Sequence, residues 1–171
     1  MNLKGNQIKG LITGLTGLML LIASMLPVFA PTALMRAAAT IAGESASSFG
    51  LFSNFREGIV NTPFAMGLAL IMAIVILIAA VILIVQGILM FVNGKFATTK
   101  AFAIPLIVVS VLAIIGAICA FAHAGADGWS LIINAGAAPI MWIIFGVLGV
   151  IGAIVTPILL KKFGKDEATT T

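Results

Sequence analysis

The sequence has little charge for its length. Asp, Glu, Lys and Arg make up 8% of its 171 residues, whereas a soluble domain carries about 25%. Most of its surface therefore does not face water. The net charge of +4 is small, and the lysines stand beside the ends of apolar runs instead of clustering with polar neighbours. This arrangement argues against nucleic acid as a partner.

Residues that carry out chemistry are equally scarce. Cys119 is the one cysteine and His123 the one histidine, so the chain forms no internal disulfide. The two lie four residues apart and offer two ligands, whereas a structural zinc site needs about four. One histidine with Asp127 outside the membrane makes no credible Ser/His/Asp arrangement, and no Walker-type glycine loop is present. We expect no enzyme, no cofactor and no metal.

Long apolar runs are what the chain has in quantity. Residues 64–92 form an uncharged run of 29 residues, in which Gln86 is the only strongly polar side chain. A helix of that length spans about 43 Å, more than the roughly 30 Å of a bilayer's hydrocarbon core. Further runs occupy residues 11–30, 101–123 and 138–160. The sequence predicts a single all-α domain over residues 1–171, an integral membrane four-helix transmembrane bundle.

The first run, residues 11–30, allows two interpretations. A basic start and Val28-Phe29-Ala30 are typical of a cleaved secretory signal. However, the run is longer than a usual signal core, and Pro31 after the cut would make a poor protease substrate. We favour a retained first helix; cleavage would leave three spans.

Lysine placement predicts the topology. A four-span chain has an outer loop at 31–63, an inner link at 93–100, an outer turn at 124–137 and a tail at 161–171. All seven lysines then fall on one side and Arg36 and Arg56 on the other. The positive-inside rule places both termini in the cytoplasm of a plasma or cytoplasmic membrane. We expect interfacial anchors at Trp129, Lys95, Lys161 and Lys162.

Glycines recur on two of the expected helices. Small residues at such spacings let helix backbones approach closely in lipid. We expect close helix contacts, and self-assembly through them, at Gly14, Gly17, Gly146, Gly149 and Gly152. Gln86 is expected to bond to a neighbouring helix, since Ser110, Thr156 and Gln86 are too few to line a pore.

The outer loop carries much apolar content for a segment of its length. Phe49, Phe52 and Phe55 stand three residues apart, and Leu51 lies between them. Such a segment is more typical of packed or membrane-associated structure than of disorder. We expect Phe49, Leu51, Phe52 and Phe55 to form an outer recognition surface.

The layout resembles the claudin-like superfamily of tetraspan proteins, which includes the PMP22-like proteins. In that family a Gly-Leu-Trp motif in the first outer loop is followed shortly by cysteine. Here Gly50-Leu51-Phe52 stands at the motif's place, Phe55 at the first cysteine's, and Arg56 is likened to the loop's basic residue. Neither loop cysteine is present, so the family's disulfide is absent. The resemblance implies lateral self-assembly and adhesion or barrier formation.

These features predict a non-enzymatic multi-pass membrane protein that acts in assembly or recognition. Its expected partners are the lipid bilayer and either further copies of itself, in a homo-oligomer, or other membrane protein subunits. One alternative is a small oligomeric channel or a lipid or small-molecule permeation protein. Another is an immunity-type accessory membrane protein that shields a partner.

Overall fold

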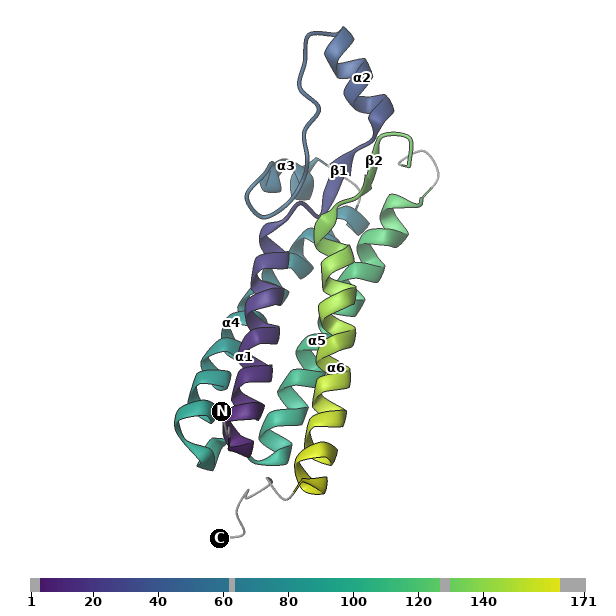
Figure 1. Cartoon of the computed structure of the whole chain (residues 1–171). Helices are drawn as coiled ribbons and strands as arrows, with labels where there is room; N and C mark the ends of the chain where they lie inside the picture. The colour runs from purple at the N-terminus through teal and green to yellow at the C-terminus, as the bar shows by residue number, and fades with distance from the viewer. Residues whose placement is uncertain (1–3, 62–63, 127–129, 164–171) are drawn as a thin grey trace.

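Four long helices standing side by side dominate the chain (Figure 1). The computed structural model describes residues 4–61, 64–126 and 130–163. All four helices are long and apolar enough to cross a membrane: α1 (Gly5–Met25), α4 (Phe64–Val92), α5 (Thr99–Ala124) and α6 (Ala137–Lys162). The chain is therefore an integral, multi-pass membrane protein with a four-helix bundle, as its composition predicts.

The first helix lies nearer the N-terminus than the expected 11–30. It begins at Gly5 because its first turns are polar yet packed: Asn6 Nδ2 donates to the Met90 carbonyl at 3.3 Å, and Lys9 is 1% exposed. It ends at Met25. Leu26 follows in an extended conformation, and Pro27 comes next. Proline disfavours helical geometry in the residue before it.

The other three spans are close to their expected bounds. Helix α4 has the predicted ends, while α5 and α6 are longer than predicted by one to two residues at each end. Helix α5 starts early because Thr98 caps it, its hydroxyl accepting a hydrogen bond from Ala101 N at 3.2 Å. Lys161 and Lys162 lie in the last turn of α6, where positive charge favours the helix dipole.

The bundle packs as a closed ring in the order α1, α4, α5, α6, and its closest pairs are α1 with α4 and α5 with α6. Small residues line the contacts between helices, and larger side chains fill the remaining core. Alanines at 73, 80, 113, 117 and 120 are fully buried, whereas many isoleucines, leucines and valines point outward. This inverts a soluble bundle, because lipid tails solvate large aliphatic side chains as well as a core does.

A small folded cap covers one end of the bundle. Strand β1 (Phe29–Pro31) pairs antiparallel with β2 (Ile133–Ala135), and Ala30 lies opposite Asn134. Two short helices complete this cap end, α2 (Ala33–Ile41) and α3 (Phe55–Val60). The sequence did not predict the sheet, since strands of three residues are too short to show a periodic pattern.

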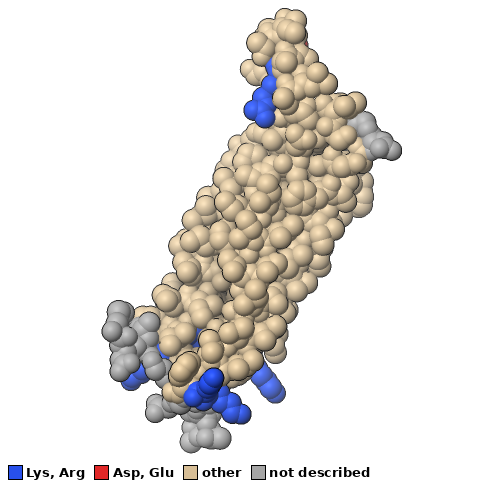
Figure 2. All heavy atoms as spheres, turned by 45° about the vertical axis from the view of Figure 1, so that its right-hand side comes forward, with Lys and Arg blue, Asp and Glu red and all other residues tan. Residues whose placement is uncertain are grey.

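The opposite end, the lysine end, carries the first and last described residues, Lys4 and Phe163, and the turn η1 (Gly94–Phe96). All six described lysines belong to this end, and blue basic atoms gather there in Figure 2. The Lys9 ammonium donates to the Ala97 carbonyl at 3.2 Å. Gln86 donates to the Ala101 carbonyl of α5, which confirms its expected role between helices.

Candidate functional site

The cap joins three segments that are distant in sequence. Beyond the β1–β2 pairing, Phe29 exchanges two backbone hydrogen bonds with Phe49, each 3.0 Å from nitrogen to oxygen. Val28 N also donates to the Phe49 carbonyl at 2.9 Å. The segment after α1, the segment before α3 and the segment before α6 are thereby fixed to one another. The cap is a rigid platform rather than a set of loose loops.

One close backbone contact joins Gly136, between β2 and α6, to the segment between α1 and β1. Gly136 N donates to the Val28 carbonyl at 2.7 Å. A methyl group on Gly136 would overlap the Pro27 carbonyl oxygen and lie 3.1 Å from the Val28 carbonyl carbon. Its φ of −78° is open to any residue, so glycine is required here by the close approach and not by backbone conformation.

A buried polar cluster lies beneath the sheet. Trp142 Nε1 donates to Ser24 Oγ at 3.3 Å, and that hydroxyl donates in turn to the Leu20 carbonyl at 2.9 Å. The His123 ring meets the Phe29 ring edge-on, with centroids 5.4 Å apart. Trp142 and Ser24 are fully buried and His123 is 4% exposed. These contacts tie α1, α5 and α6 to the sheet and open no path to a substrate.

The described residues contain no group of three His, Cys, Asp or Glu side chains that could hold a metal ion. Cys119 is partly buried and packs against the hydrophobic core.

Helix α2 stands out from the cap as an arm on a firm base (Figure 1). Thr32 caps it by accepting from Met35 N at 3.2 Å, and the same hydroxyl donates to the Leu131 carbonyl at 2.8 Å. Thr32 N donates to the Ile132 carbonyl at 3.0 Å. Arg36 Nε donates to the Pro31 carbonyl at 3.2 Å. The base of the arm is thus bonded to both segments of the sheet.

The arm exposes an apolar face. Leu34 is 65% exposed and Ile41 is 88% exposed. They are seven residues apart and so lie on one side of the helix. Arg36 and Thr40, four residues apart, lie together on another side. Ala39 is the only buried residue of α2. We call Leu34, Ala38 and Ile41 the arm face.

The structure separates the residues expected to form one outer recognition surface. Phe49, Leu51 and Phe55 are partly buried and pack against the core, so the expectation that they form an exposed surface is corrected. Phe52 is 75% exposed at the tip of a turn closed by Gly50 and Ser53. Arg56 is exposed on α3. Phe49 and Phe55 pack inward, and the backbone hydrogen bonds of Phe49 attach this third segment to the cap.

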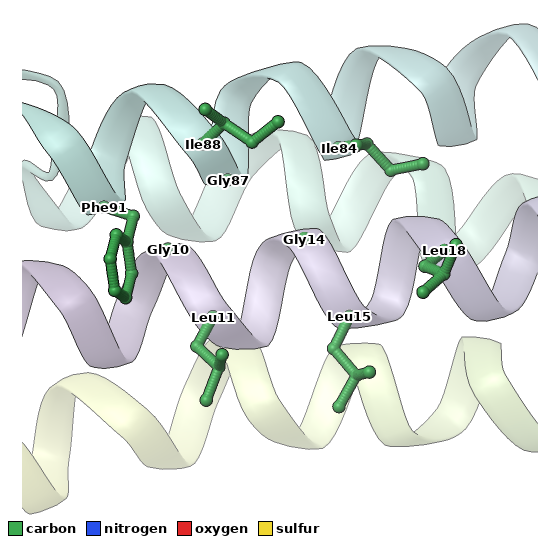
Figure 3. Close-up of a pocket in the computed structure, with 9 residues that line it drawn as sticks. All are labelled: Gly10, Leu11, Gly14, Leu15, Leu18, Ile84, Gly87, Ile88 and Phe91. Carbon is green, nitrogen blue, oxygen red and sulfur yellow. The ribbon is translucent and has the colours of Figure 1, made fainter.

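The glycines of α1 contact a helix of the same chain. A methyl group on Gly17 would lie 2.8 Å from the Ala80 carbonyl oxygen of α4. Gly10 and Gly14 lie along the same contact, opposite Gly87 (Figure 3). A shallow apolar groove of about 340 Å³ remains above them, lined by Gly10, Leu11, Gly14, Leu15, Leu18, Ile84, Gly87, Ile88 and Phe91.

The glycines of α6 also contact helices of the same chain. Methyl groups on Gly146 and Gly149 would meet Ser110 of α5, the first at 2.8 Å from its carbonyl oxygen. One on Gly152 would lie 3.2 Å from Ile12 Cγ2 of α1. These glycines therefore contact other helices of the same bundle, and self-assembly through them stays a prediction.

The expected interfacial anchors lie at the lysine end where the structure describes them. Lys95 is exposed in η1, and Lys161 and Lys162 are exposed at the end of α6. Trp129 lies outside the described residues.

Sequence reasoning missed the arm face. A signal was present, because Thr32 precedes an alanine-rich segment as a helix cap would, and Leu34 and Ile41 follow at helical spacing. The pairing partner of residues 29–31 had no comparable local signal.

Comparison of the chain with protein-family models, with curated proteins and with solved structures finds no match.

Proposed function

We propose that this chain is a non-enzymatic membrane protein that presents the α2 arm to a partner protein. The observation that carries the proposal is the arm face: Leu34 and Ile41 are largely exposed on a helix whose base is bonded to the cap. Exposed apolar surface beside polar side chains is typical of a recognition site. A rigid mount lowers the entropy that binding must overcome.

The position of the arm favours a protein over lipid as its partner. Helix α2 lies on the far side of the sheet from the four spans (Figure 1). A helix of nine residues is about 14 Å long, which carries Ile41 well past the ends of the spans. An apolar helix face presented there fits a hydrophobic groove on another protein.

The partner in this proposal is a second copy of the chain or another membrane protein subunit. An immunity-type accessory role is a case of the latter, in which the partner is the protein being shielded. The claudin-like resemblance points to the former and to adhesion. The pairing of β1 with β2 joins the two segments at the cap end, and this supports the proposal. The loop cysteines of the claudin-like family are absent from this sequence.

The proposal places the cap end outside the cytoplasm. Among the described residues, the lysine end carries six lysines, whereas the cap end carries Arg36 and Arg56 beside Glu44 and Glu57. The positive-inside rule then puts the lysine end and both chain ends in the cytoplasm.

No observation favours the permeation alternative. Gln86 bonds to α5, Ser110 packs against Gly149, and Thr156 lies between α6 and α1 near the lysine end. These polar side chains stand at three separate helix contacts and do not share a path.

Photocross-linking from the arm tests the proposal. A benzophenone side chain is placed at Ile41 in intact cells, and at Thr40 as the matched control on another side of the same helix. We expect a discrete protein adduct from position 41 and little from position 40. Its mass distinguishes a second 17.6 kDa copy from another subunit. Ile41→Glu should also abolish the adduct formed from position 34.

Equal adducts from positions 40 and 41, or adducts with lipid alone, would overturn the proposal. Flux of small solutes into vesicles that contain the purified protein would instead support the permeation alternative.

A further inference from the structure

A second apolar groove lies between α1 and α6 at the lysine end. Its volume is about 510 Å³, and its lining residues are Ile8, Ile12, Thr156, Leu159, Leu160 and Phe163. That volume falls within the range of about 300–1,000 Å³ that is typical of small-molecule sites. Phe163 is 67% exposed at one edge of the groove. The groove lies beside the last turn of α6, which carries Lys161 and Lys162.

The size of the α6 side chains changes along its contact with α1. Toward the cap end α6 presents glycines: methyl groups on Gly149 and Gly152 would lie 3.2 Å from Thr16 and Ile12. After Gly152, α6 carries no glycine up to Phe163. The groove lies along this second part, between larger side chains of the two helices.

The same antiparallel register places lysines at the mouth of the groove. Gly149 lies opposite Thr16, and Gly152 lies opposite Ile12. The two helices run antiparallel with the same rise of about 1.5 Å per residue, so residues earlier in α1 lie opposite residues later in α6. Extending this register brings Ile8 level with Thr156, and Lys4 level with Leu160 and Lys161. Lys4, Lys161 and Lys162 are all exposed.

Within residues 4–61, 64–126 and 130–163, the charged side chains at the lysine end are all positive. Both carboxylates among the described residues, Glu44 and Glu57, belong to the cap end. Figure 2 shows basic atoms gathered at the lysine end. Lysines above an apolar groove complement a ligand with a hydrocarbon chain and an anionic head, and basic pockets between spans bind the headgroups of anionic lipids. A neutral lipid would leave the lysines without a counter-charge.

We propose that this groove binds one acyl chain of an anionic phospholipid, and that Lys4, Lys161 and Lys162 hold the headgroup phosphate. The apolar walls bury the chain, and each lysine adds attraction for the phosphate at the membrane surface. The ligand enters sideways from the leaflet that faces the lysine end.

Lipid retention measured by native mass spectrometry tests the proposal. The full-length protein is released from nanodiscs of phosphatidylglycerol and phosphatidylcholine in equal amounts. We expect one phosphatidylglycerol to stay bound per chain, in preference to phosphatidylcholine. The triple variant K4Q/K161Q/K162Q should lower that preference roughly tenfold or more.

The control is K95Q/K100Q, which removes two charges from the same end of the molecule but at η1 and the first turn of α5. It should leave retention unchanged. Ile8→Trp, which fills the groove, should lower retention without removing charge. The residues after Phe163, including Asp166 and Glu167, are kept in every variant.

The proposal is overturned if wild-type protein retains phosphatidylcholine as well as phosphatidylglycerol, or retains neither. It is also overturned if K95Q/K100Q lowers retention as much as the triple variant, since the lysines would then act only through bulk charge. Unchanged retention in Ile8→Trp would show that the lipid binds elsewhere.

Discussion

Gly14 and Gly87 differ sharply in the space that surrounds each of them. A methyl group on Gly87 would lie 2.5 Å from Gly14 N, whereas one on Gly14 would lie 3.9 Å from Gly87 Cα. The two residues face each other across one contact, yet only one of them has room for a side chain. The sequence predicted a close helix contact at Gly14 but not at Gly87, which is the residue of the pair without room for a side chain.

This asymmetry predicts that Gly87→Ala is much more harmful than Gly14→Ala. Overpacking against backbone costs about 1–3 kcal/mol, while alanine at position 14 meets an ordinary contact and gains helix propensity. Titration with a denaturing detergent should lower the unfolding midpoint for Gly87→Ala and leave Gly14→Ala near wild type. Equal shifts would contradict the contact described here.

A second prediction concerns Ser110, whose hydroxyl is buried and has no hydrogen-bond partner in the part of the chain that the structure describes. A methyl group on Gly149 would overlap that oxygen. Gly149→Ala should therefore destabilise the bundle, and Ser110→Ala should relieve much of the cost. Ser110→Ala alone should be close to neutral, because it removes an unsatisfied polar group.

A double-mutant cycle measured by the same titration gives the coupling between Ser110 and Gly149, expected at about 0.5–3 kcal/mol. Some cost should remain, since Thr16 Cγ2 also lies 3.2 Å from the added methyl group. If Gly149→Ala cost the same with serine and with alanine at position 110, the account of this contact would be wrong.

Among the elements, the spans were predictable and the cap was not. Helix α4 shows its full length in the sequence because 29 apolar residues leave no other structure in lipid. The start of α1 was misplaced because Asn6 and Lys9 look like a polar lead. Asn6 donates to Met90 and Lys9 donates to Ala97, and each of these acceptors lies more than 80 positions away in the sequence.

The sheet also forms between segments that are far apart in the sequence. Its two strands are separated by about a hundred residues, and Phe49 joins from a third segment. Local pattern carries no information on such pairing. Phe49 and Phe55 pack against the core through contacts of this kind, whereas Phe52 and the α2 residues Leu34 and Ile41 are exposed.

The cap predicts a sharp difference between two glycines near its edge. Gly136→Ala would push a methyl group into the Pro27 carbonyl, whereas Gly125→Ala would meet the Phe121 carbonyl oxygen at 3.4 Å. Hydrogen exchange should show lost protection at the Thr32 and Gly136 amides in Gly136→Ala, because both donate across the cap. Gly125→Ala serves as the control and should retain it.

Wild-type exchange rates in Gly136→Ala would mean that the cap tolerates the added methyl group, and the tight contact between Gly136 and Pro27 would be refuted. Loss of protection throughout α1 and α6 as well would show instead that the cap and the bundle unfold together.

In the molecule as a whole, the lysine end and the cap end divide the functions proposed here. The cap presents the arm face to a protein, and the lysine end meets anionic lipid. Both proposals require that the four helices span the bilayer and leave the two ends on opposite sides. The placement of seven lysines and two arginines in the sequence predicts this division.

The most direct test of that arrangement is labelling of single cysteines with a membrane-impermeant maleimide in intact cells. Cys119→Ala removes the only natural thiol, and Ile41→Cys and Lys162→Cys are then introduced separately. We expect position 41 to react at once and position 162 to react only after the cells are permeabilised. Labelling of both positions in intact cells, or of position 162 alone, would contradict a four-span protein with its arm outside.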